Sequence, residues 1–286
     1  MEKIVYLNGK YMQESEAKVS IFDRGFLFAD GIYEVVPVVN HKVLDKKPFF
    51  ERLKYSLSQV QIEVTLTESE ILTMIETLIE KNSIKEGAVY MQITRGVSPR
   101  NFSFPKDITS TFMAFAFEKN ILNNPQAIDG VKVASVEDIR WKRRDIKSIA
   151  LLAQCIAKEE AVQKDAFEGW MIEDGYVTEG TTSSAFIVKD EVIITRPLSN
   201  EILPGIRRKI LLEIVEKYKF KLQERTFTIE EALDADEAFM SSATTFVLPI
   251  IEIDGKKIGT GKPGNIYKKL RELYVQSSLK EAGVSL

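Results

Sequence analysis

The sequence of 286 residues contains a single cysteine, Cys155, and a single histidine, His41. One cysteine cannot form an internal disulfide, and the absence of a Cys/His cluster argues against a zinc site. A Ser-His-Asp triad would have to use His41, which we predict to lie in the turn of a β-hairpin. Cys155 lies in an apolar helical run, so we predict a packed core thiol. We therefore expect no metal and no catalytic triad.

The sequence also has no long apolar run and no strong charge of one sign. No segment approaches the ~20 apolar residues of a membrane-spanning helix, and the N-terminus lacks the pattern of a secretory signal. A net charge of -3 gives no field that would attract nucleic acid or an anionic membrane. We expect a soluble cytoplasmic protein that binds neither. Because no Gly-rich nucleotide fingerprint occurs, an enzyme of this sequence would rely on lysine, arginine, carboxylates and hydroxyls, with an organic cofactor.

The pattern of strands and helices predicts an α+β fold. Asn8-Gly9 indicates a hairpin turn, and residues 31–50 indicate a second hairpin, in which Pro37 favours an edge or a bulge. Two helices are expected over residues 49–62 and 67–83. The strands and helices do not follow the regular alternation of a doubly wound sheet, which points to two α+β domains.

A polar, turn-rich stretch suggests where these domains meet. We predict an N-terminal domain over 1–120, a linker over 121–129 and a C-terminal domain over 130–286 that carries Lys147.

Lys147 lies between a cationic segment and a long apolar helix. Ser148 is a suitable N-cap for a helix that begins at Ile149, which would place Lys147 near a positive helix end. Arg143 and Arg144 are close in sequence, and cationic neighbours lower the pKa of a lysine, as an amine nucleophile requires. The alternative interpretation is a solvated surface charge.

Three further stretches combine polar residues with a strand end or a helix start. Glu179 follows a strand in "GYVTEGTTSSAF", and is either a turn residue or a buried partner for a cofactor nitrogen. Pro204-Gly205 precedes a helix whose first N–H groups can bind phosphate, although many such helices bind nothing. Residues 239–249, "FMSSATTFVLP", are either a capped loop or a second wall of a phosphate site.

Together and in this order, these stretches resemble the class IV (fold type IV) pyridoxal-phosphate aminotransferases. The resemblance runs from about Ile4 to Lys269 and is closest to the D-amino acid aminotransferases. It is carried by the motifs "DRGFLFADGIYEVV", "ERL", "TRGVSPR", "DIRWKRRDIKS", "VTEGTTSS", "LPGIRR" and "SSATT". It implies the two-domain fold type IV, the cofactor pyridoxal 5'-phosphate and a homodimer.

The resemblance also implies roles for individual residues. Lys147 would be the Schiff-base lysine, Glu179 the partner of the pyridine nitrogen and Arg52 a phosphate ligand. The other implied cofactor contacts are Thr182, Ser183, Leu203, Gly205, Ile206, Arg207, Ala243 and Thr244. The implied substrate contacts are Tyr33, Arg100 and Phe102.

The implied reaction is ping-pong transamination between D-amino acids and 2-oxo acids, such as D-alanine, D-glutamate and 2-oxoglutarate. The alternatives on the same fold are a branched-chain L-amino acid aminotransferase and an aminodeoxychorismate lyase. A cofactor-binding protein without turnover is a further alternative, against which the presence of both Lys147 and Glu179 argues.

The sequence departs from the family pattern at three positions. Phe102 stands where the D-specific enzymes usually have histidine, so one expected carboxylate donor is missing. Pro37 replaces a basic residue that is common in some of them, and Arg207 replaces the usual threonine of the phosphate loop. The first two positions bear on substrate choice, and the third alters the cofactor site.

Overall fold

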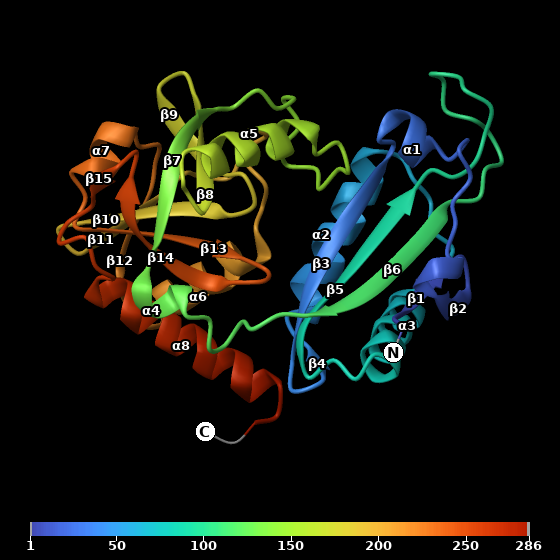
Figure 1. Ribbon diagram of the computed structural model, residues 1–286, viewed down its shortest axis with the longest axis horizontal. Coiled ribbons are helices and arrows are strands. Elements are labelled where there is room, and N and C mark those ends of the chain that lie inside the picture. The colour runs from blue at the N-terminus through green and yellow to red at the C-terminus, as the bar shows by residue number, and fades with distance from the viewer. Residues whose placement is uncertain (1, 285–286) are drawn as a thin grey trace. The chain divides into compact units, whose positions relative to one another are not determined.

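The computed structural model describes residues 2–284, whose helices and strands are drawn in Figure 1. The chain divides into two compact units. Within the described residues, unit 1 comprises 2–120, 146–150 and 279–284, and unit 2 comprises Ile121–Asp145 and Leu151–Ser278. The segment with Lys147 therefore belongs to unit 1, whereas we had predicted it in the C-terminal domain. The predicted linker 121–129 is part of unit 2 and contains the short helix α4 (Gln126–Asp129).

Unit 1 is built on an antiparallel sheet. Its strands among the described residues, in spatial order, are β2 (Lys10–Gln13), β1 (Ile4–Leu7), β6 (Thr111–Glu118), β5 (Glu86–Thr94), β3 (Gly31–Val39) and β4 (Lys42–Val43). The predicted Asn8-Gly9 hairpin is confirmed: both residues adopt positive φ between β1 and β2. These two residue types accept that conformation at low cost.

Pro37 lies in β3 between β5 and β4 and is buried. β4 pairs with Val38 and Val39, while on the other side Pro37 is opposite Ala88 of β5. The carbonyl of Pro37 accepts from the N–H of Leu44, just after β4, at 3.1 Å. Pro37 therefore lies at the end of the β3/β4 pairing and not on the exposed edge that we had considered.

Helices α2 (Lys46–Gln59) and α3 (Glu68–Lys81) pack against this sheet. α3 begins with a capping box in which Thr67 and Glu70 satisfy each other's backbone N–H groups. Both helices bury an apolar stripe, including Phe49 and Leu53 of α2. The shorter α1 (Arg24–Phe28) and a 3-10 turn, η1 (Glu14–Glu16), complete the helices of the described part of unit 1.

Unit 2 contains a larger mixed sheet. Its strands among the described residues, in spatial order, are β12 (Lys221–Glu224), β11 (Val192–Thr195), β10 (Ser184–Lys189), β13 (Glu237–Ser242), β14 (Phe246–Ile253), β7 (Val131–Glu137), β8 (Glu168–Glu173) and β9 (Tyr176–Gly180), with β15 (Lys256–Lys257) beside β14. The β11/β12, β14/β7 and β7/β8 pairs are parallel and the other pairs are antiparallel.

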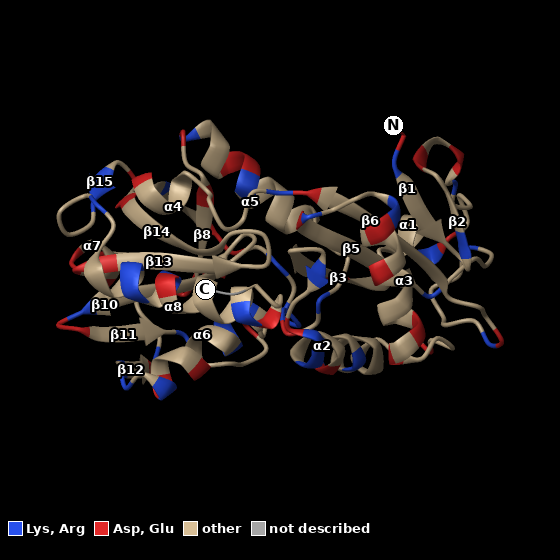
Figure 2. Ribbon diagram, turned by 90° about the horizontal axis from the view of Figure 1, so that it is seen from below, with Lys and Arg blue, Asp and Glu red and all other residues tan. Residues whose placement is uncertain are grey.

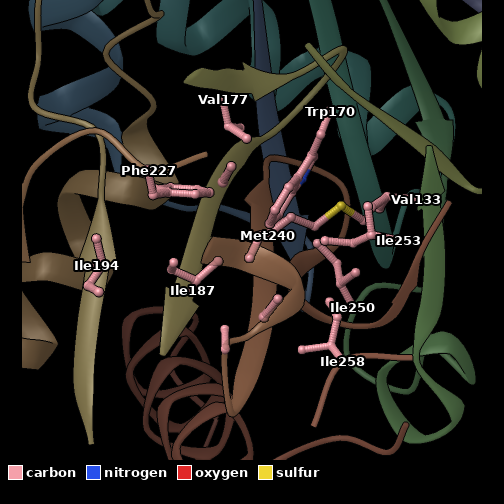
Figure 3. Close-up of a cluster of buried hydrophobic side chains, with 14 of the residues drawn as sticks. Val133, Trp170, Val177, Ile187, Ile194, Phe227, Met240, Ile250, Ile253 and Ile258 are labelled. Carbon is pink, nitrogen blue, oxygen red and sulfur yellow. The ribbon is translucent and has the colours of Figure 1, made fainter. Parts of the chain in front are cut away.

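Helices of unit 2 cover this sheet. α5 (Leu152–Gln163) packs on β7 and β8, α6 (Ile206–Lys217) on β13, and α4 on β14. Figure 3 shows a buried hydrophobic cluster on this sheet, in which the rings of Trp170 and Phe227 meet edge to face with their centroids 5.8 Å apart. The remaining helices are α7 (Ile229–Leu233) and α8 (Asn265–Glu281), of which residues 279–281 belong to unit 1.

Two predictions about the helix after Lys147 are wrong. The helix begins at Leu152 rather than Ile149, and its N-cap is the apolar Leu151 rather than Ser148. Its buried stripe is narrow and consists of alanines, so Cys155 is exposed instead of packed in the core. Apolar side chains of the same helix also face outward, such as Leu152 (74% exposed).

Charged residues of both signs are spread over the two units (Figure 2). Within residues 2–284, none of the helices combines the length and the apolar character that crossing a membrane requires. In the same range, no cluster of three or more histidine, cysteine or acidic residues is arranged to hold a metal ion.

Candidate active-site residues

Lys147 lies on an extended segment that continues the edge of the unit 1 sheet. Its carbonyl accepts from the N–H of Tyr33 at 2.9 Å, and the N–H of Ile149 donates to the carbonyl of Gly31 at 3.1 Å. The N–H of Lys147 donates to Ser56 Oγ at 3.2 Å. These bonds hold residues 146–150 to β3 and α2, which explains why the helix cannot begin at Ile149.

The structure brings two predicted site residues, Lys147 and Tyr33, together. The Nζ atom of Lys147 lies 4.1 Å from the centroid of the Tyr33 ring, a cation–π distance. Tyr33 in turn stacks on Tyr90, with the ring centroids 5.6 Å apart. Burial raises the pKa of Tyr90 to about 12, so its hydroxyl stays protonated and donates to Gln92. The amine of Lys147 therefore faces the ring of Tyr33, which the stacked ring of Tyr90 holds in place.

Arg52 forms a buried, bidentate ion pair with Glu34. Its Nε and Nη2 atoms lie 2.8 and 2.7 Å from the two carboxylate oxygens, and Glu34 is completely buried. We had predicted Arg52 as a phosphate ligand. The pair occupies one edge of the guanidinium, so a phosphate would have to be bound by its remaining edge.

Arg100 and Phe102 lie in the connection between β5 and β6, which we call the Arg100 loop (residues 95–110). Both side chains are exposed, and the Arg100 guanidinium carbon is 5.3 Å from the ring centroid of Phe102. The structure thus brings these two predicted substrate residues together.

In unit 2, Glu179 is buried near the end of β9. Its Oε1 atom accepts from Arg140 Nη1 at 2.6 Å and from the backbone N–H of Leu203 at 3.1 Å. Burial raises the pKa of Glu179, and the charge and hydrogen bond of Arg140 oppose that rise. Glu179 is therefore not an exposed turn residue, and it is in direct contact with Leu203, another residue that we predicted to bind the cofactor.

Arg140 is itself held by a second carboxylate, Asp138. Nε and Nη2 of Arg140 lie 2.9 and 2.7 Å from the two oxygens of Asp138, which also accepts from Thr178 Oγ1 at 2.6 Å. Burial alone would raise the pKa of Asp138, but the hydrogen bonds from Arg140 and Thr178 and the charge of Arg144 hold it below its ordinary value. Asp138, Arg140 and Glu179 form one continuous buried network.

Arg143 and Arg144, which we expected to be cationic neighbours of Lys147, each have an acidic partner. Arg143 pairs with Asp145 at 2.9 Å, and Arg144 pairs with Glu173 at 2.8 Å. Their charges are compensated within unit 2.

Thr182 and Ser183, which we predicted as cofactor contacts, form hydrogen bonds within unit 2. Their hydroxyls lie 2.6 and 3.3 Å from the buried carboxylate of Glu168, which the hydroxyl of Thr181 also contacts. Lys158 supplies a positive charge 3.6 Å from the same carboxylate. These hydroxyl donors therefore hold the loop after β9.

The predicted phosphate-binding elements are present as local structures. Gly205 is the N-cap of α6, so the helix begins at Ile206, followed by the buried Arg207. A Cβ atom at Gly205 would come within 2.8 Å of Ser184 Oγ. Ala243 and Thr244 form the turn between β13 and β14.

That turn is anchored by Arg271 of α8. Its buried guanidinium donates to the carbonyls of Thr245 and Val247, at 3.1 and 2.6 Å, and to those of Ile121 and Leu122, at 2.9 and 3.1 Å. One side chain thus ties the turn to the start of unit 2.

The family profile described as amino-transferase class IV matches residues 31–253. The chain belongs to the class IV aminotransferases. It is therefore an enzyme that transfers amino groups, and the matched region includes Lys147, Glu179 and the start of α6.

Proteins with similar sequences carry a narrower name. The chain is 40% identical over 271 residues to the D-alanine aminotransferase of Staphylococcus haemolyticus, covering 94% of this chain and 95% of that protein. It is 36% identical over 277 residues to the D-alanine aminotransferase of Bacillus licheniformis, covering 97% and 98% of the two chains.

Solved structures with a similar fold carry a different name. A branched-chain amino acid aminotransferase from T.th., solved with pyridoxamine 5'-phosphate, matches with a TM-score of 0.91 and 22% identity, over 97% of this chain and 94% of that chain. The Escherichia coli branched-chain amino acid aminotransferase matches with a TM-score of 0.90 and 20% identity, over 97% and 95%. At these identities the likeness establishes the class IV fold and nothing narrower.

Sequence reasoning about this aminotransferase missed three buried acidic residues. Glu34, Asp138 and Glu168 were not singled out, although each is buried and organises a predicted site residue or its neighbour. A usable signal was present for Glu34, since it stands in the otherwise apolar strand "GIYEVVPVV". A carboxylate buried in such a strand needs a cationic partner.

Proposed function

We propose that this aminotransferase exchanges amino groups between D-amino acids and 2-oxo acids, with D-alanine, D-glutamate and 2-oxoglutarate among its substrates. The observation that carries the proposal is the 40% identity to a D-alanine aminotransferase over 94% of the chain. The two half-reactions would follow a ping-pong order, in which the first product leaves before the second substrate binds.

We further propose pyridoxal 5'-phosphate as the cofactor, because the available donors fit its chemical groups. Glu179 offers a buried carboxylate for a protonated ring nitrogen, and Gly205 leaves the N-terminal N–H groups of α6 uncovered by any side chain of its own. Ala243 and Thr244, in the turn anchored by Arg271, offer further backbone donors. When bound, the cofactor supplies an aldehyde carbon that accepts the amino group and a ring that delocalises electrons from the substrate Cα.

The residues of the chain would divide the remaining work among them. Lys147 Nζ would move the proton to and from the substrate Cα, and the Tyr33 ring below it would keep water from that side. Arg140 would keep Glu179 ionised, so that a carboxylate faces the ring nitrogen. Arg100 would bind the substrate carboxylate.

The rival function is transamination of branched-chain L-amino acids. It is favoured by Phe102, which removes a donor that the D-specific enzymes usually have, and gives an apolar wall in its place. An aminodeoxychorismate lyase is the more distant alternative.

A panel of single amino acids, offered to the cofactor-loaded enzyme without an oxo acid, separates these functions. The cofactor's absorbance reports one half-reaction at a time. We expect D-alanine and D-glutamate to react faster than L-leucine and L-isoleucine. If an L-branched-chain substrate reacts at least as fast as every D-amino acid, the rival function replaces the proposal.

Lys147→Ala is the matched negative control for this panel. It removes the proposed proton carrier, so no amino acid of either hand should react. Half-reactions at the rate of the unmodified enzyme would show that Lys147 has been given the wrong role.

We also propose that the enzyme works as a homodimer in the cytoplasm, as its sequence resemblance implies. Light scattering on the purified, cofactor-loaded protein tests the dimer, and a mass of one chain of 32.5 kDa would exclude it.

A further inference from the structure

We propose that Asp30 is the positioning residue of the Arg100 loop: it compensates two arginines that hold this loop and leaves Arg100 as the arginine that can bind an anion. This inference rests on the proposed function, in which Arg100 binds the substrate carboxylate. All the residues involved belong to unit 1.

Asp30 binds two guanidinium groups with its two oxygens. Oδ2 lies 2.7 Å from Arg24 Nε and 2.8 Å from Arg95 Nε, and Oδ1 lies 2.9 Å from Arg95 Nη2. The side chains of both arginines are almost completely buried, at 3% and 5% exposure. Because buried charges require a partner, the carboxylate of Asp30 makes it possible to bury both Arg24 and Arg95.

Each of these arginines then holds a part of the loop. Arg24 Nη1 donates to the carbonyl of Asn101 at 2.5 Å, next to Arg100 in the chain. The guanidinium carbon of Arg95 lies 3.5 Å from the ring centroid of Phe104, further along the loop. Asp30 is therefore connected, through these two arginines, to two residues that follow Arg100 in the loop: Asn101 by a hydrogen bond and Phe104 by a cation–π contact.

Backbone contacts strengthen the same attachment. The N–H of Arg95 donates to the carbonyl of Asp30 at 3.1 Å, and the N–H of Arg24 donates to that of Gly96 at 2.9 Å. The N–H of Ser98 donates to the carbonyl of Phe22 at 3.2 Å. The start of the loop is thus fixed to residues 22–30.

Arg100 differs from the other two arginines in having no anionic partner. Within residues 2–284 no carboxylate pairs with it, and its contacts are aromatic. Its guanidinium carbon is 5.3 Å from the ring centroids of both Phe28 and Phe102, which are 5.4 Å from each other. Ring faces orient a guanidinium without occupying its N–H donors, so these remain available for a carboxylate.

This arrangement gives Phe102 a specific part. Phe102 stands where the resemblance leads us to expect a histidine that donates to the substrate carboxylate. Its ring instead packs beside the guanidinium of Arg100. Substrate carboxylate recognition then depends on how accurately a single guanidinium is held, and that depends on Asp30.

The decisive variant is Asp30→Asn, measured with the cofactor-loaded enzyme. We expect KM for D-alanine to rise about tenfold, as for the loss of one charge-assisted hydrogen bond, with kcat within a factor of two and an unchanged cofactor spectrum. Amide hydrogen exchange of residues 96–104, measured without substrate, should become faster. Arg24→Met serves if Asp30→Asn fails to fold, because Asp30 then keeps Arg95 as its partner while the bond to Asn101 is lost.

Asp23→Asn is the matched control. Asp23 is the N-cap of α1 and accepts from the N–H of Gly25, a role that asparagine fills equally well. It should leave both KM and the exchange of residues 96–104 unchanged.

Arg100→Ala distinguishes the role of Arg100 in binding the substrate carboxylate from the positioning role of Asp30. If Arg100→Ala raises KM while Asp30→Asn and Arg24→Met change neither KM nor exchange, the positioning role of Asp30 is overturned and the proposed function stands. If Arg100→Ala leaves KM unchanged, the carboxylate assignment is wrong, and with it the positioning role for substrate binding. A rise in KM together with faster exchange in the Asp30 and Arg24 variants supports both.

Discussion

Arg140 Nη1 donates to Glu179 Oε1 over 2.6 Å, and both side chains are buried. A buried carboxylate without a cation would take up a proton at neutral pH, and a neutral acid cannot act as the anionic partner of a protonated ring nitrogen. The pair therefore determines the protonation state of Glu179, and Arg140 acts on the site through it.

Arg140→Met should destabilise the enzyme by about 3–5 kcal/mol at pH 8, because it leaves buried carboxylates without their shared cation. The loss should be smaller at pH 5. In the variant, Arg140 no longer opposes the rise that burial causes in the pKa of Glu179, so the folded variant retains a proton that the unfolded chain releases above the ordinary value of 4.5, and the stability of the variant falls as the pH rises between the two values. Thermal unfolding at both pH values measures this. Arg225→Met, which breaks an exposed pair with Glu231, is the control and should change little at either pH.

Asp138→Asn should show the opposite dependence on pH. The pKa of Asp138 is held below its ordinary value of 3.8, so its ion pairs stabilise the fold above that value, and this contribution disappears as the pH falls through the lowered pKa. We expect the variant to be less stable than the unmodified enzyme by about 3 kcal/mol at pH 7 and by clearly less near pH 3, in urea unfolding. Asp234→Asn, an exposed position, is the matched control. An equal gap at both pH values would contradict the assigned ionisation.

Arg271→Met should cost about 3 kcal/mol or more, since four carbonyl groups lose a charged donor and at least two of them are buried with it. Chemical unfolding measures the cost. Lys269→Met removes an exposed cation two residues earlier in the same helix and should cost less than about 1 kcal/mol. Similar values for the two variants would mean that the hydrogen bonds of Arg271 contribute no more to stability than a surface ion pair.

Gly205→Ala should destabilise the enzyme by about 1–3 kcal/mol through contact, because the new Cβ atom would approach Ser184 Oγ to 2.8 Å. The backbone φ of -62° suits alanine, so the effect does not come from backbone strain. Adding Ser184→Ala removes the opposing atom and should recover most of the loss. A double-mutant cycle by urea unfolding gives the interaction, and additive costs would place the effect elsewhere.

Features determined by neighbouring residues were predictable from the sequence. The Asn8-Gly9 turn and the helix after Thr67 depend on local backbone chemistry, and both occur where expected. The motif order around Lys147 and Glu179 was sufficient to identify the family.

Features determined by partners distant in the chain were not predictable in this way. Residues 146–150 have a helix-compatible sequence, but pairing with Gly31 and Tyr33 keeps them extended. Nothing near Arg52 in sequence indicates that Glu34 will occupy one edge of its guanidinium. A charge pattern gives the sign and number of charged groups, whereas the choice of partner depends on how strands and helices pack.

Unit 1 is built from segments that are far apart in the chain, and this affects how the enzyme folds during synthesis. The N–H of Asp45 donates to Glu281 Oε1 at 2.7 Å, and Asn40 Nδ2 donates to the carbonyl of Ala282 at 3.3 Å. These partners are separated by 236 and 242 residues in the chain. Residues 2–120 are synthesised first, but the packing of unit 1 can be completed only after residues 279–282 have been made, so a nascent chain carries an unpaired sheet edge beside β3 until Lys147 and its neighbours emerge.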